Sequence, residues 1–285
     1  MNVFPIIEQG AHRAIKNQEI KDCDFYDDEG FLVCGICKER RQEIKEFSNP
    51  CPENPKNKTA LKVTRSCKCD RERTTKDKED KYIKYLKETS GIDKKYESVT
   101  FSSCSLNKFN EKPLKLCKRY ALSFDKMLSN NQGLLLWGDV GTGKTHAAVC
   151  IADYLISQKI PVLMTSLHKI ISEIEAREEP ENVIISRLEK AKLVIFDDLG
   201  TERDTAYALE KVYRIIDNRN SSGLPMIFTT NLSLKDMQEE EDLRYVRIYE
   251  RILEVCYPIQ FTGPSWRKRE AVGRFKEMER LLNED

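Results

Sequence analysis

The 285-residue sequence lacks any apolar run approaching the ~20 residues that a membrane-spanning helix requires. It also lacks a dominant charge, because 48 Lys and Arg face 47 Asp and Glu, for a formal net charge of +1. We therefore expect no membrane span and no general electrostatic attraction to nucleic acid or lipid. Any contact with nucleic acid must come from a local patch of basic residues.

Two further absences concern secretion and metal binding by histidine. The first residues, M-N-V-F-P-I-I-E-Q-G, have neither the basic region nor the apolar core of a secretory signal, so we expect a cytoplasmic protein. There are only three histidines, His12, His146 and His168, and they form no metal-binding spacing. In a reducing compartment, the ten cysteines are expected to bind metal or to be buried as free thiols.

Cysteines gather near the N-terminus. Two close pairs, C-G-I-C (34–37) and S-C-K-C-D (66–70), could supply four thiolates to a tetrahedral structural zinc. The second pair has one intervening residue instead of the usual two. A segment so poor in apolar residues nevertheless needs a cross-link such as a bound metal to fold. We predict Zn²⁺ bound by Cys34, Cys37, Cys67 and Cys69. Cys51 is the main rival ligand and Cys23 a weaker one, whereas Cys104, Cys117, Cys150 and Cys256 are expected to be free buried thiols.

The chain divides into three parts: a cysteine-rich zinc-binding module over 1–70, a charged linker helix over 71–94, and an α/β domain over 95–285. In the third part, apolar strands alternate with amphipathic helices, which predicts a parallel, doubly wound sheet. We expect strands at 134–137, 161–165, 193–196, 226–229 and 258–261. We expect helices at 144–157, two within 167–190, and one at 204–220 with Asp204 as its cap.

Between the first strand and its helix lies G-D-V-G-T-G-K-T (138–145), which matches the P-loop pattern. Its backbone N–H groups can cradle phosphate oxygens at a helix N-terminus. Lys144 is placed to reach the β- and γ-phosphates, and the Thr145 hydroxyl to bind Mg²⁺. The predicted nucleotide-binding residues are Gly138, Asp139, Val140, Gly141, Thr142, Gly143, Lys144, Thr145 and His146, the last expected to pack more than to react.

The third strand ends in two aspartates, within L-V-I-F-D-D-L-G-T-E (193–202). A strand ending in Asp, expected beside the P-loop strand, holds the metal in P-loop proteins, so we assign Asp197 to Mg²⁺ together with Thr145. We assign Asp198 to the water that attacks ATP, as general base. Asp is one methylene shorter than the more usual Glu, so Glu202 stays an alternative base. Asn231, after the fourth strand, is expected to hold that water or the γ-phosphate.

These motifs, with Y-E-R-I-L-E (249–254) and G-P-S-W-R-K-R-E (263–270), resemble the DnaC/DnaI-type replicative helicase loaders, which are AAA+ ATPases. The resemblance implies an AAA+ P-loop sheet flanked by helices. It also implies that Arg251 is an arginine finger acting on the ATP of a neighbouring subunit, and therefore that the protein self-assembles. Arg267 would be a sensor arginine reaching the γ-phosphate in cis. Arg247 and Arg269 are close competitors for these two roles.

The same resemblance implies that an extra helix within 166–192 grips single-stranded DNA. Lys169, Arg177 and Arg187 are the basic candidates for contacts with phosphates. The stretch contains no aromatic residue to stack on bases, and a solvated helix face explains these charges equally well.

We therefore predict a bacterial or phage-borne protein that binds a hexameric replicative DNA helicase and delivers it onto single-stranded DNA. ATP binding and slow hydrolysis, stimulated by the partner or by DNA, would switch engagement and release. One alternative is an IstB-type transposition ATPase, against which the cysteine module argues. Another is an ATP-gated DNA-binding scaffold with little turnover, which the short base at Asp198 keeps open.

Overall fold

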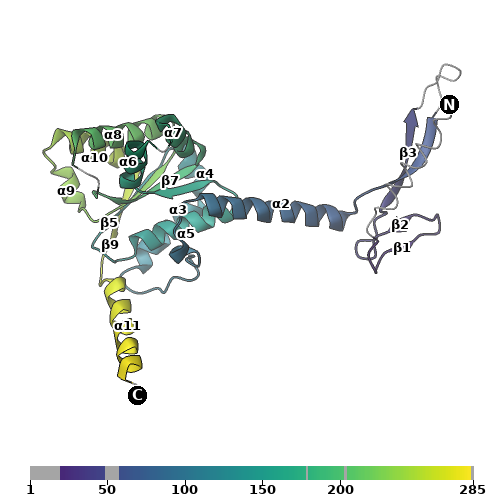
Figure 1. Ribbon diagram of the computed structural model, residues 1–285, viewed down its shortest axis with the longest axis horizontal. Coiled ribbons are helices and arrows are strands. Elements are labelled where there is room, and N and C mark those ends of the chain that lie inside the picture. The colour runs from purple at the N-terminus through teal and green to yellow at the C-terminus, as the bar shows by residue number, and fades with distance from the viewer. Residues whose placement is uncertain (1–19, 49–57, 178, 202–203, 284–285) are drawn as a thin grey trace. The chain divides into compact units, whose positions relative to one another are not determined.

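The computed structural model describes residues 20–48, 58–177, 179–201 and 204–283 (Figure 1). Cys51 and Glu202, named above as alternatives, lie outside these residues. The chain forms two compact units, Met1–Lys81 and Tyr82–Asp285. Across the described ranges, no helix is both long and apolar enough to cross a bilayer.

The first unit contains two antiparallel hairpins that the sequence did not predict. Strand β1 (Phe25–Tyr26) pairs with β2 (Leu32–Val33), and β3 (Gln42–Ser48) pairs with β4 (Lys58–Thr64). Most of β3 is exposed, so its side chains do not alternate between apolar and polar, and the sequence gives no basis for predicting a strand there.

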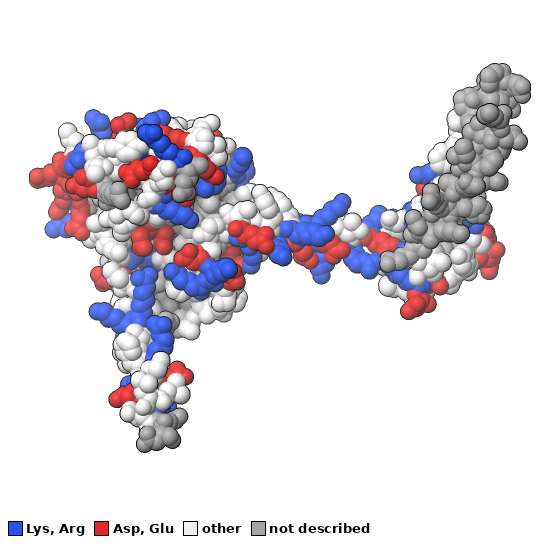
Figure 2. All heavy atoms as spheres, in the orientation of Figure 1, with Lys and Arg blue, Asp and Glu red and all other residues white. Residues whose placement is uncertain are grey.

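Helix α2 (Lys68–Thr89) begins in the first unit and ends in the second. Lys, Arg, Asp and Glu alternate along its surface, as Figure 2 shows, and nearly all its residues are exposed. Leu86, near its end, is buried against the second unit's core. A charged helix was predicted for this part of the chain.

A parallel five-stranded sheet forms the centre of the second unit, with strand order β6-β7-β8-β5-β9. The strands are β5 (Gly133–Gly138), β6 (Val162–Thr165), β7 (Leu193–Leu199), β8 (Met226–Thr230) and β9 (Cys256–Phe261). All four neighbouring pairs are parallel, which confirms the predicted α/β fold. The expectation that the Asp197 strand lies beside the P-loop strand is wrong, because β8 is inserted between β7 and β5.

Helices cover both faces of this sheet (Figure 1). One face packs against α6 (Leu167–Ala176), α7 (Glu181–Lys190), α8 (Ala206–Ser221) and α10 (Leu243–Val255). The other packs against α3 (Glu111–Leu122), α4 (Phe124–Ser129) and α5 (Lys144–Ser157). Successive strand residues alternate between the two cores: Leu135 points to the first, and Leu134 and Leu136 to the second. A sheet buried on both faces reads as continuous apolar runs, which is why its strands were visible in the sequence.

The remaining described helices are η1 (Lys94–Tyr96), α9 (Leu234–Gln238) and α11 (Trp266–Asn283). The predicted cap of α8 is wrong by one residue. Thr205 caps the helix, since its side chain accepts a hydrogen bond from the Ala208 N–H. Asp204 instead lies 3.2 Å from Arg244 in an ion pair.

Candidate functional site

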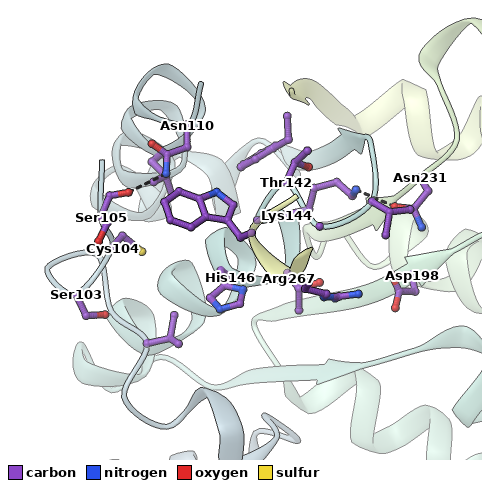
Figure 3. Close-up of a pocket in the computed structure, with 18 of the residues that line it drawn as sticks. Ser103, Cys104, Ser105, Asn110, Thr142, Lys144, His146, Asp198, Asn231 and Arg267 are labelled. Atoms are coloured by element: carbon purple, nitrogen blue, oxygen red, sulfur yellow. Dashed lines mark hydrogen bonds between the residues drawn. The ribbon is translucent and has the colours of Figure 1, made fainter. Parts of the chain in front are cut away.

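A cleft of about 380 Å³ opens at the carboxyl ends of the central strands. It is lined at one end by Lys144, Asp198, Asn231 and Arg267, and at the other by Ser103, Cys104, Ser105 and Asn110 (Figure 3). Open parallel sheets bind ligands at this edge, because loops and helix N-termini diverge there. The sequence-predicted residues of four separate segments therefore meet in one place.

The loop at 138–145 has a positive φ at Gly138, Gly141 and Gly143, and at the first two of these there is also no room for a side chain. Gly138 has a φ of 129°, and a Cβ there would lie 2.1 Å from the carbonyl oxygen of Phe261. Gly141 has a φ of 80°, and a Cβ there would lie 2.1 Å from Ser265 Oγ. The Trp266 N–H also donates to the Gly141 carbonyl at 2.9 Å. The segment that begins α11 is thus fitted against the loop.

Lys144, the first residue of α5, is buried with its ammonium group at the centre of the loop. Its Nζ donates to the carbonyls of Gly138 and Asp139 at 2.7 and 2.8 Å, and to Asn231 Oδ1 at 2.8 Å. Burial lowers the pKa of this lysine, while the carboxylates of Asp198 and Asp139 oppose that shift. Asn231 follows β8, so the strand between β7 and β5 carries the side chain that contacts Lys144.

Asp197 lies at the end of β7 and accepts two hydroxyl hydrogen bonds on one oxygen. Thr145 Oγ1 donates to its Oδ1 at 2.9 Å, and Thr229 Oγ1 donates to the same atom at 2.6 Å. Burial raises the pKa of this carboxyl, and the bond from Thr229 counteracts the effect. Thr145 and Asp197 are therefore adjacent, as a shared Mg²⁺ ligand set requires. The sequence did not single out Thr229.

Asp198 points into the cleft because the backbone at the end of β7 is irregular. The β7–β8 register shifts between Phe196 and Leu199, and Asp198 has a φ of 57°. Left-handed backbone is uncommon for residues other than glycine, and Asp tolerates it better than most. The Asp198 N–H donates to Thr229 Oγ1 at 2.9 Å, which holds this conformation. Such strain is found at functional sites, where it aims a side chain.

Arg267 and His146 also line the cleft. The positive charge of Arg267 acts on both Lys144 and Asp197, and its contribution to the pKa of each is to lower it. Its competitor Arg269 instead lies over the Trp266 ring, 5.2 Å from its centroid. The His146 ring packs edge-on against Tyr96 at 5.1 Å, in keeping with a packing role.

Arg251, on α10, lies outside this cleft. It pairs with Asp217 and Glu254, each at 3.1 Å, on a surface hollow that Arg247 also lines. The three basic candidates for DNA contact are all exposed: Lys169 on α6, Arg177 at the end of α6, and Arg187 on α7. Arg187 is paired with Glu173, so its charge is partly compensated within the protein.

A second cluster of reactive side chains lies in the first unit. The sulfur atoms of Cys34, Cys37, Cys67 and Cys69 all lie within 4.8 Å of one another. Four thiolates around zinc, with Zn–S bonds of ~2.3 Å, would have their sulfurs about 3.8 Å apart, so the group fits a tetrahedral metal. Cys23 is exposed and not part of the group.

Two backbone segments approach each other closely beside these cysteines, at Gly35 and Cys23. A Cβ at Gly35 would lie 1.7 Å from the carbonyl oxygen of Cys23, so C-G-I-C requires its glycine. The N–H groups of Cys69 and Glu39 donate to the Cys37 sulfur and lower its pKa to about 6. Hydrogen bonds of this kind stabilise the thiolate, which is the form that binds metals.

An ion-pair network that the sequence did not reveal supports the cluster. Asp70 accepts from Lys21 Nζ at 2.5 Å and from Arg41 at 3.0 Å, and it lies 3.4 Å from Cys67 Sγ. Arg41 also pairs with the fully buried side chain of Asp24. The bond from Lys21 leads the interactions that lower the pKa of Asp70 to about 2.

Comparison with known proteins places the second unit in a family. The family model for IstB-like ATP binding protein matches residues 71–273, more than half of the chain. The replicative helicase loader DnaI of Bacillus subtilis is 24% identical over 148 residues, 48% of this chain. The replicative helicase loader DnaC of Buchnera aphidicola is 26% identical over 155 residues, 52% of this chain. These matches cover 48% and 62% of the two relatives, less than two thirds of each.

A crystal structure of DnaI is similar in fold, with a TM-score of 0.52 and 22% identity. The match covers 61% of this chain and 93% of that one. At this level of identity the likeness concerns the fold alone. It agrees with the AAA+ architecture expected from the sequence.

Proposed function

Because the chain belongs to the family of IstB-like ATP-binding proteins, we propose that it is an ATP-driven loader of a hexameric replicative helicase. The observation that carries the ATPase part is the convergence of Lys144, Asp198, Asn231 and Arg267 in one cleft, with Thr145 and Asp197 hydrogen-bonded beside it. The loader part is supported by similarity to DnaI and DnaC and by the cysteine cluster.

ATP would lie with its phosphates in the 138–145 loop, whose N–H groups and helix N-terminus favour an anion. Lys144 would turn from the loop carbonyls toward the β- and γ-phosphates. Thr145 and Asp197 would hold Mg²⁺, which supplies charge neutralisation at the phosphate oxygens. The end of the cleft formed by Ser103, Cys104, Ser105 and Asn110 would take the nucleoside.

Hydrolysis would use Asp198 as the base for the attacking water. The bulge at the end of β7 aims the Asp198 carboxylate into the cleft. This carboxylate would accept a proton from the water as the water oxygen bonds to the γ-phosphorus and the bond from that phosphorus to the leaving ADP breaks. Asn231 would orient that water. Arg267 would stabilise charge that develops on the transferred group, since a guanidinium matches the geometry of phosphoryl oxygens.

Arg251 would complete the site of a neighbouring copy, since it lies on α10 and outside the cleft of its own chain. Its ion pairs with Asp217 and Glu254 would then be exchanged for the neighbour's γ-phosphate. Self-assembly follows from this role. Lys169 and Arg177 are exposed and would contact single-stranded DNA within the assembly.

Residues 1–70 would form the helicase-binding module, with zinc held by Cys34, Cys37, Cys67 and Cys69, and residues 71–94 would link it to the ATPase domain at 95–285. Zinc here would be structural, because four thiolates leave no open position for substrate.

Turnover tests the ATPase part directly. ATP hydrolysis is measured with and without single-stranded DNA for wild type and Lys144→Ala. The expected result is slow hydrolysis that DNA raises and that Lys144→Ala abolishes. Binding of ATP without any Lys144-dependent turnover would favour the ATP-gated scaffold instead. Stable association with a transposase, and none with a helicase, would favour the IstB-type alternative.

A further inference from the structure

Two cysteines of the second unit lie with their sulfur atoms in contact. Cys104 Sγ and Cys150 Sγ are 3.4 Å apart, although 46 positions separate the residues. A disulfide bond is ~2.05 Å long, so an approach of about 1.4 Å would join them. Cys104 lies in the segment between η1 and α3 and lines the cleft, whereas Cys150 is buried within α5, the helix that Lys144 begins.

We propose that Cys104 and Cys150 are a redox-active dithiol in the wall of the cleft, which low-molecular-weight disulfides convert to an intramolecular disulfide and which bound nucleotide protects. The protection rests on the proposed nucleotide site, whereas the dithiol chemistry stands on the geometry of the two sulfurs.

The surroundings of the two thiols give them different roles. The hydrogen bond between the two thiols lowers the pKa of Cys104 to about 7. Cys104 lines the cleft and is only partly buried, so a small disulfide can reach it, and a lowered pKa favours the thiolate that attacks. The hydrogen bond to Cys104 and burial raise the pKa of Cys150. Cys104 is the attacking group, and Cys150 is the resolving thiol.

The exchange is balanced without any further reactant. The Cys104 thiolate attacks one sulfur of a small disulfide, R–S–S–R, forming a mixed disulfide and releasing RS⁻. Cys150 then loses its proton and attacks the Cys104 sulfur, and the second RS⁻ leaves with that proton as RSH. Both protein thiols are oxidised to one disulfide, and the small disulfide is reduced to two thiols.

The other two cysteines of this unit provide a contrast. Cys117 and Cys256 are buried, and burial raises the pKa of each thiol. Neither lines the cleft that Cys104 shares with Gly141, Thr142 and Lys144. A small disulfide that enters from the cleft therefore meets Cys104, and a nucleotide that fills the cleft covers it.

Peptide mapping of the full-length, zinc-loaded protein tests the proposal. The protein is incubated with oxidised glutathione, its remaining thiols are blocked with iodoacetamide, and it is digested with trypsin without reductant. Cys104 and Cys150 fall in separate tryptic peptides, 96–108 and 145–159, each with a single cysteine. We expect these two peptides to be linked as the main product, and dithiothreitol to release them. Glutathione adducts or other cysteine pairs, with no 96–108 to 145–159 link, would overturn the proposal.

Cysteine variants test the formation of the disulfide, and added nucleotide tests its protection. Cys104→Ser should give no link, and Cys117→Ala should leave it unchanged. ATP with Mg²⁺, at about ten times its dissociation constant measured by calorimetry, should slow formation of the link about tenfold. Lys144→Ala removes a tryptic site, so its Cys150 peptide is 127–159; this variant should form the link at the wild-type rate with or without ATP. If calorimetry shows no ATP binding while the link forms, the proposed function fails and the dithiol stands; if ATP binds and does not slow the link, the protection fails.

Discussion

Thr229 Oγ1 donates a 2.6 Å hydrogen bond to Asp197 Oδ1 while it accepts a 2.9 Å bond from the Asp198 N–H. One hydroxyl on β8 therefore fixes both aspartates of β7. Thr145 donates to the same Asp197 oxygen from α5. The inserted strand β8 thus joins the loop that would hold phosphate to the carboxylates that would hold metal and water.

Thr229→Val keeps the size and shape of this side chain and removes its hydroxyl. The Asp198 N–H then loses its acceptor and Asp197 loses one donor, so we expect the free energy of unfolding to fall by about 1–3 kcal/mol. Mg²⁺-dependent ATP turnover should fall as well, because the aspartates are no longer held. Chemical denaturation and steady-state hydrolysis measure the two effects. Thr229→Ser, which retains the hydroxyl, is the matched control and should remain near wild type in both.

Asp198→Asn removes the base and keeps a side chain that tolerates positive φ. ATP binding should persist, and the rate of hydrolysis should fall by about 10²–10⁴-fold, the usual contribution of a general base. Glu202→Gln is the companion variant. If Asp198→Asn hydrolyses ATP normally and Glu202→Gln does not, the base is Glu202.

The proposed trans role of Arg251 predicts rescue by mixing two inactive proteins. Arg251→Ala should bind ATP and hydrolyse it poorly. In a mixture of Arg251→Ala and Asp198→Asn, some interfaces combine an intact Asp198 from one copy with an intact Arg251 from the other. Part of the wild-type hydrolysis should then return, and it should grow with protein concentration.

Arg247→Ala in the same mixture is the control for position, since Arg247 shares the surface hollow with Arg251. Rescue in the Arg247 mixture alone would transfer the finger role to Arg247. Absence of rescue in both mixtures would exclude a trans arginine on this surface of α10.

The cysteine cluster predicts one zinc per chain. Cys34→Ser should lose the metal and unfold the first unit, whose small core depends on the bound metal. Cys23→Ser, a change just outside the four-sulfur group, should retain it. Metal content by mass spectrometry and circular dichroism measure the outcome. ATP binding by the Cys34→Ser protein should be unchanged, since the second unit has its own core. Full zinc content in Cys34→Ser would contradict the assignment of that ligand.

The sequence predicted the sheet of the second unit well, because its strands are buried on both faces and its P-loop has fixed spacing. It also identified the four cysteines that the structure brings together. The hairpins of β1 with β2 and of β3 with β4 were missed because the two-residue strands and the mostly exposed β3 carry no apolar alternation. Strand order was missed because it is a tertiary property: nothing in residues 193–231 tells which strand is inserted between the others.

The site residues also fall into two groups, those that a sequence motif identifies and those that only the folded structure reveals. Lys144, Thr145 and Asp197 follow from a motif whose spacing is set by chemistry. Thr229 does not, since a threonine in a strand is ordinarily explained by β propensity. The contact between Cys104 and Cys150 joins positions far apart in the sequence and depends on how a loop folds onto α5.

The central claim is that this protein binds a hexameric replicative helicase in a nucleotide-dependent way. The direct measurement is the mass, by size-exclusion chromatography with light scattering, of a mixture of the full-length zinc-loaded protein and the replicative helicase of the cell that carries it. The mixture is run with ATP and Mg²⁺, with ADP, and without nucleotide. We predict a complex larger than the helicase hexamer, whose amount changes among the three conditions. A helicase hexamer that elutes unchanged in all three would contradict the loader function.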